Sequence, residues 1–350
     1  MTNKTQQLTT GANELEVVGT LIENNLELKV SKSGENYVSG YVKVRTGENE
    51  DQYINVFEME KTKSGKDNPS YQSITTSMKG MKSLADIIAM TPEGQEPESE
   101  PTYIQITGEL DRNEYFNTRS GELVSEQRLK GKFFSSQRSF DSEGNKRPAK
   151  AEFKASGIIE KLNEFEDNGK PMLRLSLLVP SWNGNIRPFE FTVRDPQGVD
   201  AITSQFGMGD AFLITSGLAR NFFKEEQIVE EAMWGAPEVT TVRKALREWE
   251  IKGMTRPTGT NYEDNPELVR EAKNVREQYL ASLETKAKKR DAQRGDSSND
   301  SPFAATTPTT PTTPTTPATN NDPFAVNTNA KTKTEEVPVE AFEELGDLFG

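Results

Sequence analysis

The chain contains an internal repeat, and this repeat constrains its fold more than any other feature of the sequence. The stretch ELEVVGTL (14–21) is matched by EFKASGII (152–159), and YIQITGELDRNEYF (103–116) is matched by FLITSGLARNFF (212–223). Because the matches occur in the same order, we interpret the chain as two copies of one structural unit. The first copy is longer because it contains two polar, turn-rich insertions, KTKSGKDNPSYQS and TPEGQEPESEP.

Both copies show the same order of apolar segments. Periodicity predicts strands at 14–30, 37–45, 52–57, 103–110 and 122–134 in the first copy, and at 153–165, 172–179, 187–194, 212–218 and 226–234 in the second. A helix is expected between the third and fourth strands of each copy, within 77–90 and 198–206. This order is typical of the OB-fold. We therefore predict a mainly β protein with tandem OB-fold-like, five-stranded Greek-key barrels, followed by a helix and a disordered acidic tail.

These elements divide the chain into seven segments. We expect a disordered N-terminus (1–12), a first OB-like domain (13–135), a basic connector (136–151), a second OB-like domain (152–257), a basic amphipathic helix (258–294), a disordered Thr/Pro-rich linker (295–336) and an acidic-aromatic tip (337–350). The motif EWEIKG (248–253) repeats the opening of each copy a third time, and we interpret it as an added strand on the second domain. The helix is expected to pack on the second barrel; the alternative is a basic helix that lines a nucleic-acid path or a dimer seam.

The composition excludes most catalytic chemistry, because the chain has no cysteine and no histidine. Their absence removes disulfides, thiolate nucleophiles, Ser-His-Asp catalysis and the usual zinc sites. No glycine motif for binding phosphates or dinucleotides is present. We therefore expect a protein that is not an enzyme and has no cofactor or metal, with a carboxylate-dependent Mg²⁺ nuclease as the enzymatic alternative. No apolar run approaches the roughly 20 residues of a membrane span, which predicts a soluble, cytoplasmic protein without a membrane partner.

Charge is unevenly distributed along the sequence. The formal net charge is −13, yet residues 128–154 carry eight basic and three acidic side chains. Residues 295–350, in contrast, carry nine acidic and two basic side chains. The local distribution of charge, rather than its total, decides whether a surface can bind a polyanion. The sequence therefore predicts a basic surface around the connector and a separate acidic tail.

The second strand of the first copy has two chemically different faces, because its valines alternate with aromatic and cationic side chains. Valines suit a barrel interior, whereas rings stack on unpaired bases and cations bind phosphates. OB-folds bind oligonucleotides across their second and third strands. The alternative is a solvated face with aromatic cross-strand pairs. The outward-pointing residues of this strand are Tyr37, Tyr41, Lys43 and Arg45.

Both copies place an Arg-Asn dipeptide shortly before two adjacent aromatic residues. We expect these residues to lie in the loops between the fourth and fifth strands. There, one ring can anchor the loop while its neighbour stacks on a base; alternatively, both rings plug the mouth of the barrel. The residues concerned are Arg112, Asn113, Tyr115 and Phe116 in the first copy and Arg220, Asn221, Phe222 and Phe223 in the second.

Together these patterns predict a nucleic-acid-binding surface that extends over both copies and the connector. The second copy is less aromatic, so we expect it to bind more weakly or to serve as a scaffold. Its Trp182 precedes an Asn-Gly turn and is expected either to stack on a base or to cover the core. The predicted nucleic-acid-binding residues are Lys32, Tyr37, Tyr41, Lys43, Arg45, Tyr53, Arg112, Tyr115, Phe116, Arg128, Lys130, Lys132, Arg138, Lys146, Arg147, Arg174, Trp182, Arg187, Arg220, Phe222 and Phe223.

The chain ends in VPVEAFEELGDLFG, an acidic segment with apolar anchors that follows a Thr/Pro tract. With its OB-like units, its stacking rings and this tip, the chain resembles the single-stranded DNA-binding proteins of phage and bacterial replication. The resemblance implies binding of single-stranded DNA, and a tip that docks on replication, recombination and repair enzymes and competes with DNA for the groove. The tip residues expected to bind partners are Glu340, Phe342, Glu343, Glu344, Leu345, Asp347, Leu348 and Phe349.

The chain departs from this family's pattern in two respects. Bacterial members usually have one barrel per chain and a tip that ends in Pro-Phe, whereas this tip ends in Leu-Phe-Gly. The oligomeric state therefore does not carry over. The lack of histidine, cysteine and a targeting signal is phage-like, which would place the protein in a host cytoplasm. An RNA-binding OB protein, and a virion or DNA-mimic protein without polynucleotide binding, are the alternative functions.

Overall fold

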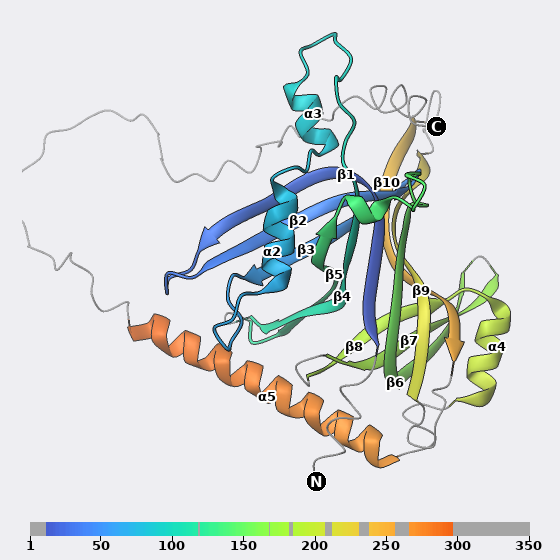
Figure 1. Ribbon diagram of the computed structural model, residues 1–350. Coiled ribbons are helices and arrows are strands. Elements are labelled where there is room, and N and C mark those ends of the chain that lie inside the picture. The colour runs from blue at the N-terminus through green and yellow to red at the C-terminus, as the bar shows by residue number, and fades with distance from the viewer. Residues whose placement is uncertain are drawn as a thin grey trace, which may run out of the picture. The chain divides into compact units, whose positions relative to one another are not determined.

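The computed structural model describes residues 12–117, 120–167, 169–181, 185–206, 212–230, 238–255 and 266–296 (Figure 1). In the ranges 212–213, 223–230, 238–245, 266–269 and 291–296 it describes the backbone without the side chains. Residues 1–11, Trp182, the Thr/Pro-rich linker from residue 297 and the whole acidic tip therefore lie outside the described residues. None of the described helices is long and apolar enough to span a bilayer.

The first barrel has the strand order β1-β2-β3-β5-β4-β1. Antiparallel ladders join β1 to β2 and β4, β2 to β3, and β4 to β5. A short parallel contact, Ile54 of β3 with Leu129 of β5, closes the barrel. This order is that of the OB-fold. The strands are β1 (Asn13–Val30), β2 (Asn36–Gly47), β3 (Glu50–Met59), β4 (Tyr103–Phe116) and β5 (Leu123–Ser135).

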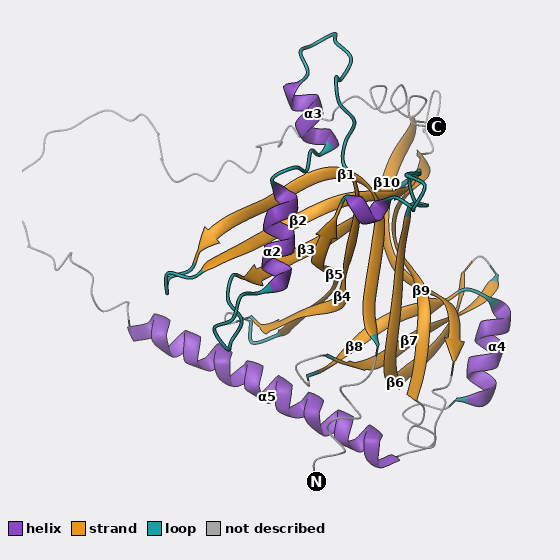
Figure 2. Ribbon diagram, in the orientation of Figure 1, coloured by secondary structure: helices purple, strands orange, loops and turns teal. Residues whose placement is uncertain are grey.

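The second barrel repeats this topology. Antiparallel ladders join β6 to β7 and β9, β7 to β8, and β9 to β10. A parallel contact between Thr192 of β8 and Glu250 of β10 closes it. The strands are β6 (Lys150–Asp167), β7 (Lys170–Pro180), β8 (Ile186–Val193), β9 (Phe212–Glu230) and β10 (Glu238–Thr255). The described residues thus confirm the predicted mainly β fold with tandem OB-type barrels followed by a helix (Figure 2).

Helices connect the third and fourth strands of both barrels. One helix was expected within 77–90, but α2 ends before Gly80 and α3 begins after it. The sequence interpretation missed α2 because its segment looks like a polar insertion; the Asn68 side chain caps it by accepting a hydrogen bond from the Ser70 backbone. Ser83 and Asp86 form a capping box that starts α3. The helical elements are α2 (Pro69–Met78), α3 (Leu84–Met90), the 3-10 turn η1 (Gln137–Ser139), α4 (Pro196–Gln205) and α5 (Pro266–Asp296).

Strand alternation places the core as expected. Val38, Val42 and Val44 of β2 are fully buried, and so are the leucines of β7 at 173, 175 and 177. The repeated glycines serve close chain approach: a Cβ atom on Gly108 would lie 1.8 Å from the Lys130 carbonyl oxygen. Only glycine allows the two strands to meet there, beside a bulge in the β4–β5 ladder.

The two barrels are related by a local pseudo-two-fold pairing of their first strands. Residues 13–18 of β1 pair antiparallel with residues 150–155 of β6. Leu15 lies opposite Phe153, and these two positions are equivalent in the internal repeat. Equivalent residues that face each other define an isologous contact, the arrangement found in two-fold symmetric dimers. The chain thus contains a pseudo-dimer of two OB barrels.

Three predictions about the ends of the barrels were wrong. The fifth strand of the second barrel was expected at 226–234, but residues up to Glu230 belong to β9, and β10 closes the barrel. The motif EWEIKG lies inside β10, so it is the closing strand rather than an addition. The expected loops after the fourth strands are themselves strand, because each fourth strand continues into a long hairpin with the fifth.

Candidate nucleic-acid interface

The outer face of β2 and β3 carries two pairs of aromatic rings. Tyr37 and Phe57 have ring centroids 5.5 Å apart, and the centroids of Tyr41 and Tyr53 are 5.8 Å apart. The β2–β3 register, which pairs Lys43 with Tyr53, brings these side chains onto one side of the sheet. Phe57 is 53% exposed, and the three tyrosines are half-buried. We call this surface the aromatic face.

The cations of the aromatic face are held by carboxylates. The Lys43 ammonium lies 3.2 Å from Glu23, 3.4 Å from Asp51 and 5.5 Å from the Tyr53 centroid. Burial alone would lower the pKa of Lys43, but Asp51 and Glu23 outweigh it and raise that pKa. Arg45 pairs with Asp51 at 3.0 Å. Lys43 is therefore charged and held beside the Tyr53 ring, and Arg45 is held by Asp51 on the same side of the strand.

Strand β5 adds three predicted cations next to β3, because the parallel contact sets Lys130 beside Asn55. Each of these cations also has an acidic partner. The nitrogen–oxygen distances are 2.6 Å for Arg128 with Asp111, 2.9 Å for Lys130 with Glu58 and 2.6 Å for Lys132 with Glu109. Sequence reasoning found the cations but did not predict this internal pairing.

The second barrel contributes to the aromatic face through its β9–β10 hairpin. The Arg247 guanidinium lies 5.7 Å from the Tyr53 centroid and 3.5 Å from Glu126. Arg220 pairs with Glu50 at 3.0 Å, and Phe222 lies opposite Glu50 in a β3–β9 contact. Sequence reasoning missed Phe57 and Arg247. Strand alternation from Tyr53 places Phe57 on the outer face, whereas the position of Arg247 depends on contact between the barrels.

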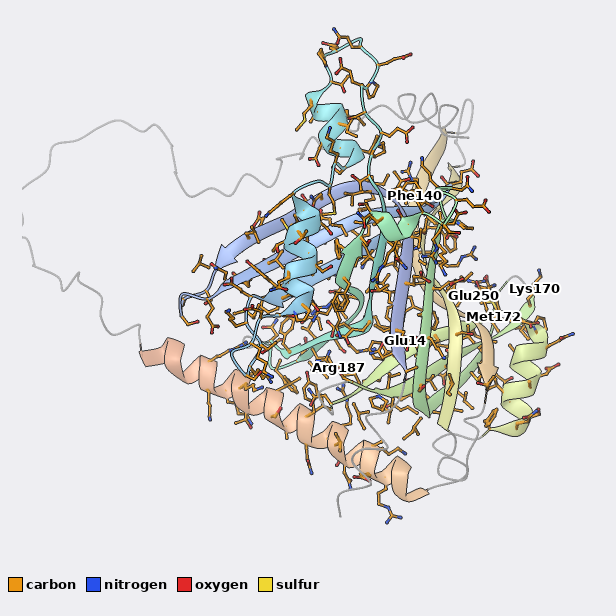
Figure 3. The ribbon with its side chains drawn as sticks, in the orientation of Figure 1. Glu14, Phe140, Lys170, Met172, Arg187 and Glu250 are labelled. Atoms are coloured by element: carbon orange, nitrogen blue, oxygen red, sulfur yellow. The ribbon has the colours of Figure 1, made fainter. Side chains whose placement is uncertain are left out.

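Two predicted binding residues lie instead between the barrels. The Arg112 side chain, 14% exposed, donates to the Pro188 carbonyl oxygen at 2.6 Å. Arg187, which Figure 3 labels, donates to Asp111 and to the Arg112 carbonyl oxygen. Burial raises the pKa of Asp111, but Arg128 and Arg187 outweigh it, so the net pKa lies below the ordinary value. These guanidiniums tie the β4–β5 hairpin to β8 and are not exposed for a ligand.

The remaining predicted residues are spread over other surfaces. Tyr115 and Phe116 end β4, in strand rather than in the expected loop, and Tyr115 is exposed. Lys32 is exposed in the turn between β1 and β2. The Phe223 side chain lies outside the described part of the chain. In the connector, Arg147 pairs with Glu16 at 2.9 Å, while Arg138 and Lys146 are exposed.

The equivalent face of the second barrel is covered by α5. Ile158, Leu178 and Ile186 on the outer side of that barrel are buried against Ala272, with Val275 beside them. When the β6–β7 ladder is matched to the β1–β2 ladder, Leu178 occupies the position that Arg45 has in the first barrel. The second barrel thus has an apolar patch where the first has a charged one. Arg174 of β7 is exposed and lies 5.2 Å from the centroid of the Phe165 ring.

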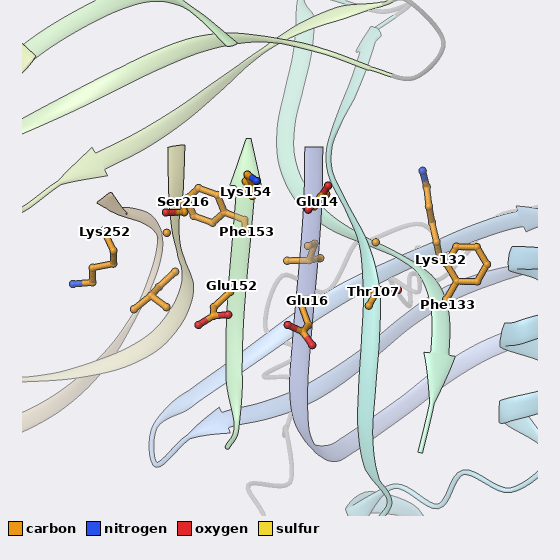
Figure 4. A pocket seen from close by; sticks show the side chains of 14 residues that line it. Glu14, Glu16, Thr107, Lys132, Phe133, Glu152, Phe153, Lys154, Ser216 and Lys252 are labelled. Carbon is orange, nitrogen blue, oxygen red and sulfur yellow. The ribbon is translucent and has the colours of Figure 1, made fainter. Parts of the chain in front are cut away.

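A cavity of about 730 Å³ lies over the seam where β1 pairs with β6 (Figure 4). Glutamates and lysines share its lining, with Glu14, Glu16 and Glu152 near Lys132 and Lys154. Of the two rings in its lining, Phe133 is exposed and Phe153 is buried. The aromatic face, with four rings, therefore suits stacking on unpaired bases better than this cavity does.

The topology and the aromatic face define a tandem OB-fold protein with one open face and one covered face. The chain belongs to the YorF family, whose model matches residues 12–286. A comparison with curated protein sequences gave no match.

Two solved structures similar to the chain are of the single-stranded DNA-binding protein from Thermus aquaticus. A deletion variant is 16% identical with a TM-score of 0.38, over 71% of this chain and 96% of that one. The wild-type protein is 14% identical with a TM-score of 0.37, over 73% of this chain and 98% of that one.

Proposed function

We propose that this protein binds single-stranded DNA through the aromatic face, without strong sequence preference. The observation that carries the proposal is the set of four rings on adjoining strands, in the Tyr37–Phe57 and Tyr41–Tyr53 pairs. Every base has a π-face, and stacking one base on such a ring contributes about 1–3 kcal/mol. Bases in a duplex already stack on each other, so the face suits unpaired strands.

Stacking contributes more than charge in this proposal. Lys43, Arg45 and Lys130 already contact carboxylates, so a phosphate that binds them exchanges one anion for another. Such an exchange releases fewer counterions than binding to unpaired lysines. We therefore expect the affinity to fall with salt, but less steeply than the number of cations would suggest.

We further propose that the acidic tip recruits replication, recombination or repair enzymes to DNA coated by the protein in the cytoplasm. Support comes from the sequence alone: Phe342, Leu345 and Phe349 give apolar anchors among carboxylates, and the Thr/Pro tract separates them from the barrels. Coating and protection of single strands by the barrels would then be coupled to delivery of an enzyme.

A fluorescence titration tests the binding proposal. The full chain is titrated with oligo(dT), a duplex of equal length and an RNA oligomer at two salt concentrations. We expect tight binding to oligo(dT) and weak binding to the duplex. Equal affinity for duplex would contradict the proposal, and equal or tighter RNA binding would replace it with an RNA-binding function. No binding at either salt concentration would favour a protein that does not bind polynucleotides.

A further inference from the structure

A second cluster of rings and cations lies where the connector between the barrels crosses β4. The Tyr103 and Phe140 rings meet edge to face, with centroids 6.2 Å apart. The Lys146 ammonium lies 5.7 Å from the Tyr103 centroid. Phe140 follows the polar turn η1 directly, and its residue is 37% exposed (Figure 3). A large exposed ring beside a cation is the combination that stacks on a base.

Hydrogen bonds fix this cluster onto the barrel. The Tyr103 hydroxyl donates to the Arg147 carbonyl oxygen at 2.6 Å, and the Ser139 hydroxyl donates to the Tyr103 carbonyl oxygen at 3.0 Å. Burial raises the pKa of Tyr103, so its hydroxyl remains a neutral donor. A β-bridge between Phe140 and Lys146 closes the connector turn. The rings are therefore held in place before any ligand arrives, which lowers the entropy cost of binding.

Strand register places the cluster on the same outer surface as the aromatic face. Tyr103 of β4 pairs with Thr20 of β1, and Thr20 pairs with Arg45 of β2. Directly paired residues point to the same side of a sheet. With strands about 4.8 Å apart and a rise of about 3.4 Å per residue, Tyr103 lies roughly 15–20 Å from Tyr41. A single oligonucleotide can span that distance.

The charges of the connector suit a phosphate chain. Lys146 pairs with Glu100 at 3.2 Å, but the two side chains are 51% and 65% exposed. Exposed ion pairs of this kind contribute little to stability, so Lys146 can readily exchange Glu100 for a phosphate. Arg138 is exposed two residues before Phe140. Both cations are more accessible than Lys43 or Lys130 of the aromatic face.

We propose that Tyr103 and Phe140, with Arg138 and Lys146, form a second base-stacking station for the strand that binds the aromatic face. The inference rests on the proposed function and extends it. The strand crosses β1 from the ring pairs toward the connector, so that long oligonucleotides contact both stations and short ones contact one. Phe140 is then a binding residue that neither the strand pattern nor the OB topology identifies.

Phe140→Ala tests the station, and Phe133→Ala is its matched control. Phe133 is also an exposed ring, at 44%, but it lines the seam cavity instead. Both variants of the full chain are titrated with oligo(dT) of about 4 and about 16 nucleotides, the limits of site size per OB fold. We expect Phe140→Ala to bind the long oligomer roughly 5- to 140-fold more weakly, the range for one base stack, and the short one unchanged.

Phe133→Ala is expected to behave like the wild type with both oligomers. A second variant, Arg138→Gln, removes a cation but no ring. It should reduce the salt slope, which is the steepness of the fall of log K with log[salt], by about 0.7. Unchanged long-oligomer affinity in Phe140→Ala, or equal losses in Phe140→Ala and Phe133→Ala, would overturn the station. If Phe57→Ala still weakens binding in that case, the proposal for the aromatic face holds and only the second station is rejected. A wild-type chain that binds neither oligomer would overturn both proposals.

Discussion

Among single residues, Phe57 has the most exposed ring of the aromatic face. Phe57→Ala should lower the affinity for oligo(dT) about 5- to 140-fold, because one base stack contributes about 1–3 kcal/mol. The free energy of unfolding should change little, since the ring is half exposed. Leu28→Ala is the control, because Leu28 is also exposed in the first barrel but lies outside the aromatic face. Equal losses in the two variants, measured by fluorescence titration, would contradict the assignment.

Arg247 tests whether the second barrel completes the aromatic face. Arg247→Ala should weaken binding to oligo(dT) and reduce the salt slope by about 0.7, the value for one phosphate contact on a single strand. Arg174→Ala is a matched control, because Arg174 also lies over a ring, that of Phe165, but on β7 and outside the aromatic face. If both variants lowered the slope equally, the strand would have to extend past the aromatic face onto β7.

Asp111 gives the contact between the barrels a pH dependence. Its pKa is lower in the folded chain than in the unfolded one, so the ionised carboxylate stabilises the fold at pH above its ordinary pKa of about 3.9. This contribution is lost as the pH falls through the lower, folded-state pKa. Asp111→Asn should cost about 1–3 kcal/mol at neutral pH and flatten the pH dependence of urea unfolding.

The control for this experiment is Glu126→Gln, which removes an exposed carboxylate from the neighbouring strand β5. Its unfolding curves should follow those of the wild type at every pH. Parallel pH profiles for wild type and Asp111→Asn would show that Asp111 does not couple the fold to protonation.

Among the elements, α5 is the one whose docking decides which barrel face is open. Ala272→Glu places a charge among Ile158, Leu178 and Ile186, and Arg276, one turn along the helix, already pairs with Glu114. We expect α5 to detach, with hydrogen exchange of its backbone amides rising at least tenfold while the strands stay protected. Asn274→Glu adds the same charge at an exposed position of the same helix and should leave exchange unchanged. Equal exchange in both variants would refute this docking role.

Strands with local alternation were predictable, and strand segments that depend on partners far away in sequence were not. Strand β2 was predicted within two residues because its valines alternate with rings. Strand β9 was predicted to end at 218, because the polar run after Phe223 weakens the pattern and its support comes from β10 and β3. Leu-Lys-Gly at 129–131, in the closing strand β5, is similar to Ile-Lys-Gly at 251–253. This similarity was the signal that could have identified β10 as the equivalent strand.

In the candidate site, too, residues placed by local alternation were predictable and residues placed by distant contacts were not. Alternation found Tyr41 and Tyr53, since both depend on one strand and its neighbour. It could not show that Arg112 lies between the barrels, because that contact joins residues 76 positions apart in sequence. Nor could it show that Lys43 already pairs with Glu23. Ion pairing depends on side-chain geometry, which residue type and spacing do not determine.

For the whole molecule, duplication has produced two barrels that support each other but differ in surface. Arg112 of β4 contacts β8, and Arg220 of β9 contacts β3, so each fourth strand reaches the third strand of the other barrel. These reciprocal contacts join the barrels into one unit. The first barrel thus keeps an open aromatic face, while the equivalent face of the second is covered by α5.

The acidic tail should oppose DNA binding at the scale of the whole chain. Residues 295–350 carry a net charge of −7, which repels phosphates and competes for the same cations. A chain ending at residue 299 should therefore bind oligo(dT) severalfold more tightly at low salt. The difference should vanish at about 1 M salt, where the Debye length is about 3 Å.

A variant with Phe342, Leu345 and Phe349 all changed to alanine separates charge from apolar docking, because it keeps every carboxylate of the tip. If the tail acts through charge, this variant should bind DNA like the wild type while the shortened chain binds more tightly. If instead the alanine variant matches the shortened chain, the rings themselves occupy the DNA-binding surface. Equal affinities for all three chains at low salt would show that the tail leaves the DNA-binding surface free, and its acidic tip would then act on partner proteins alone.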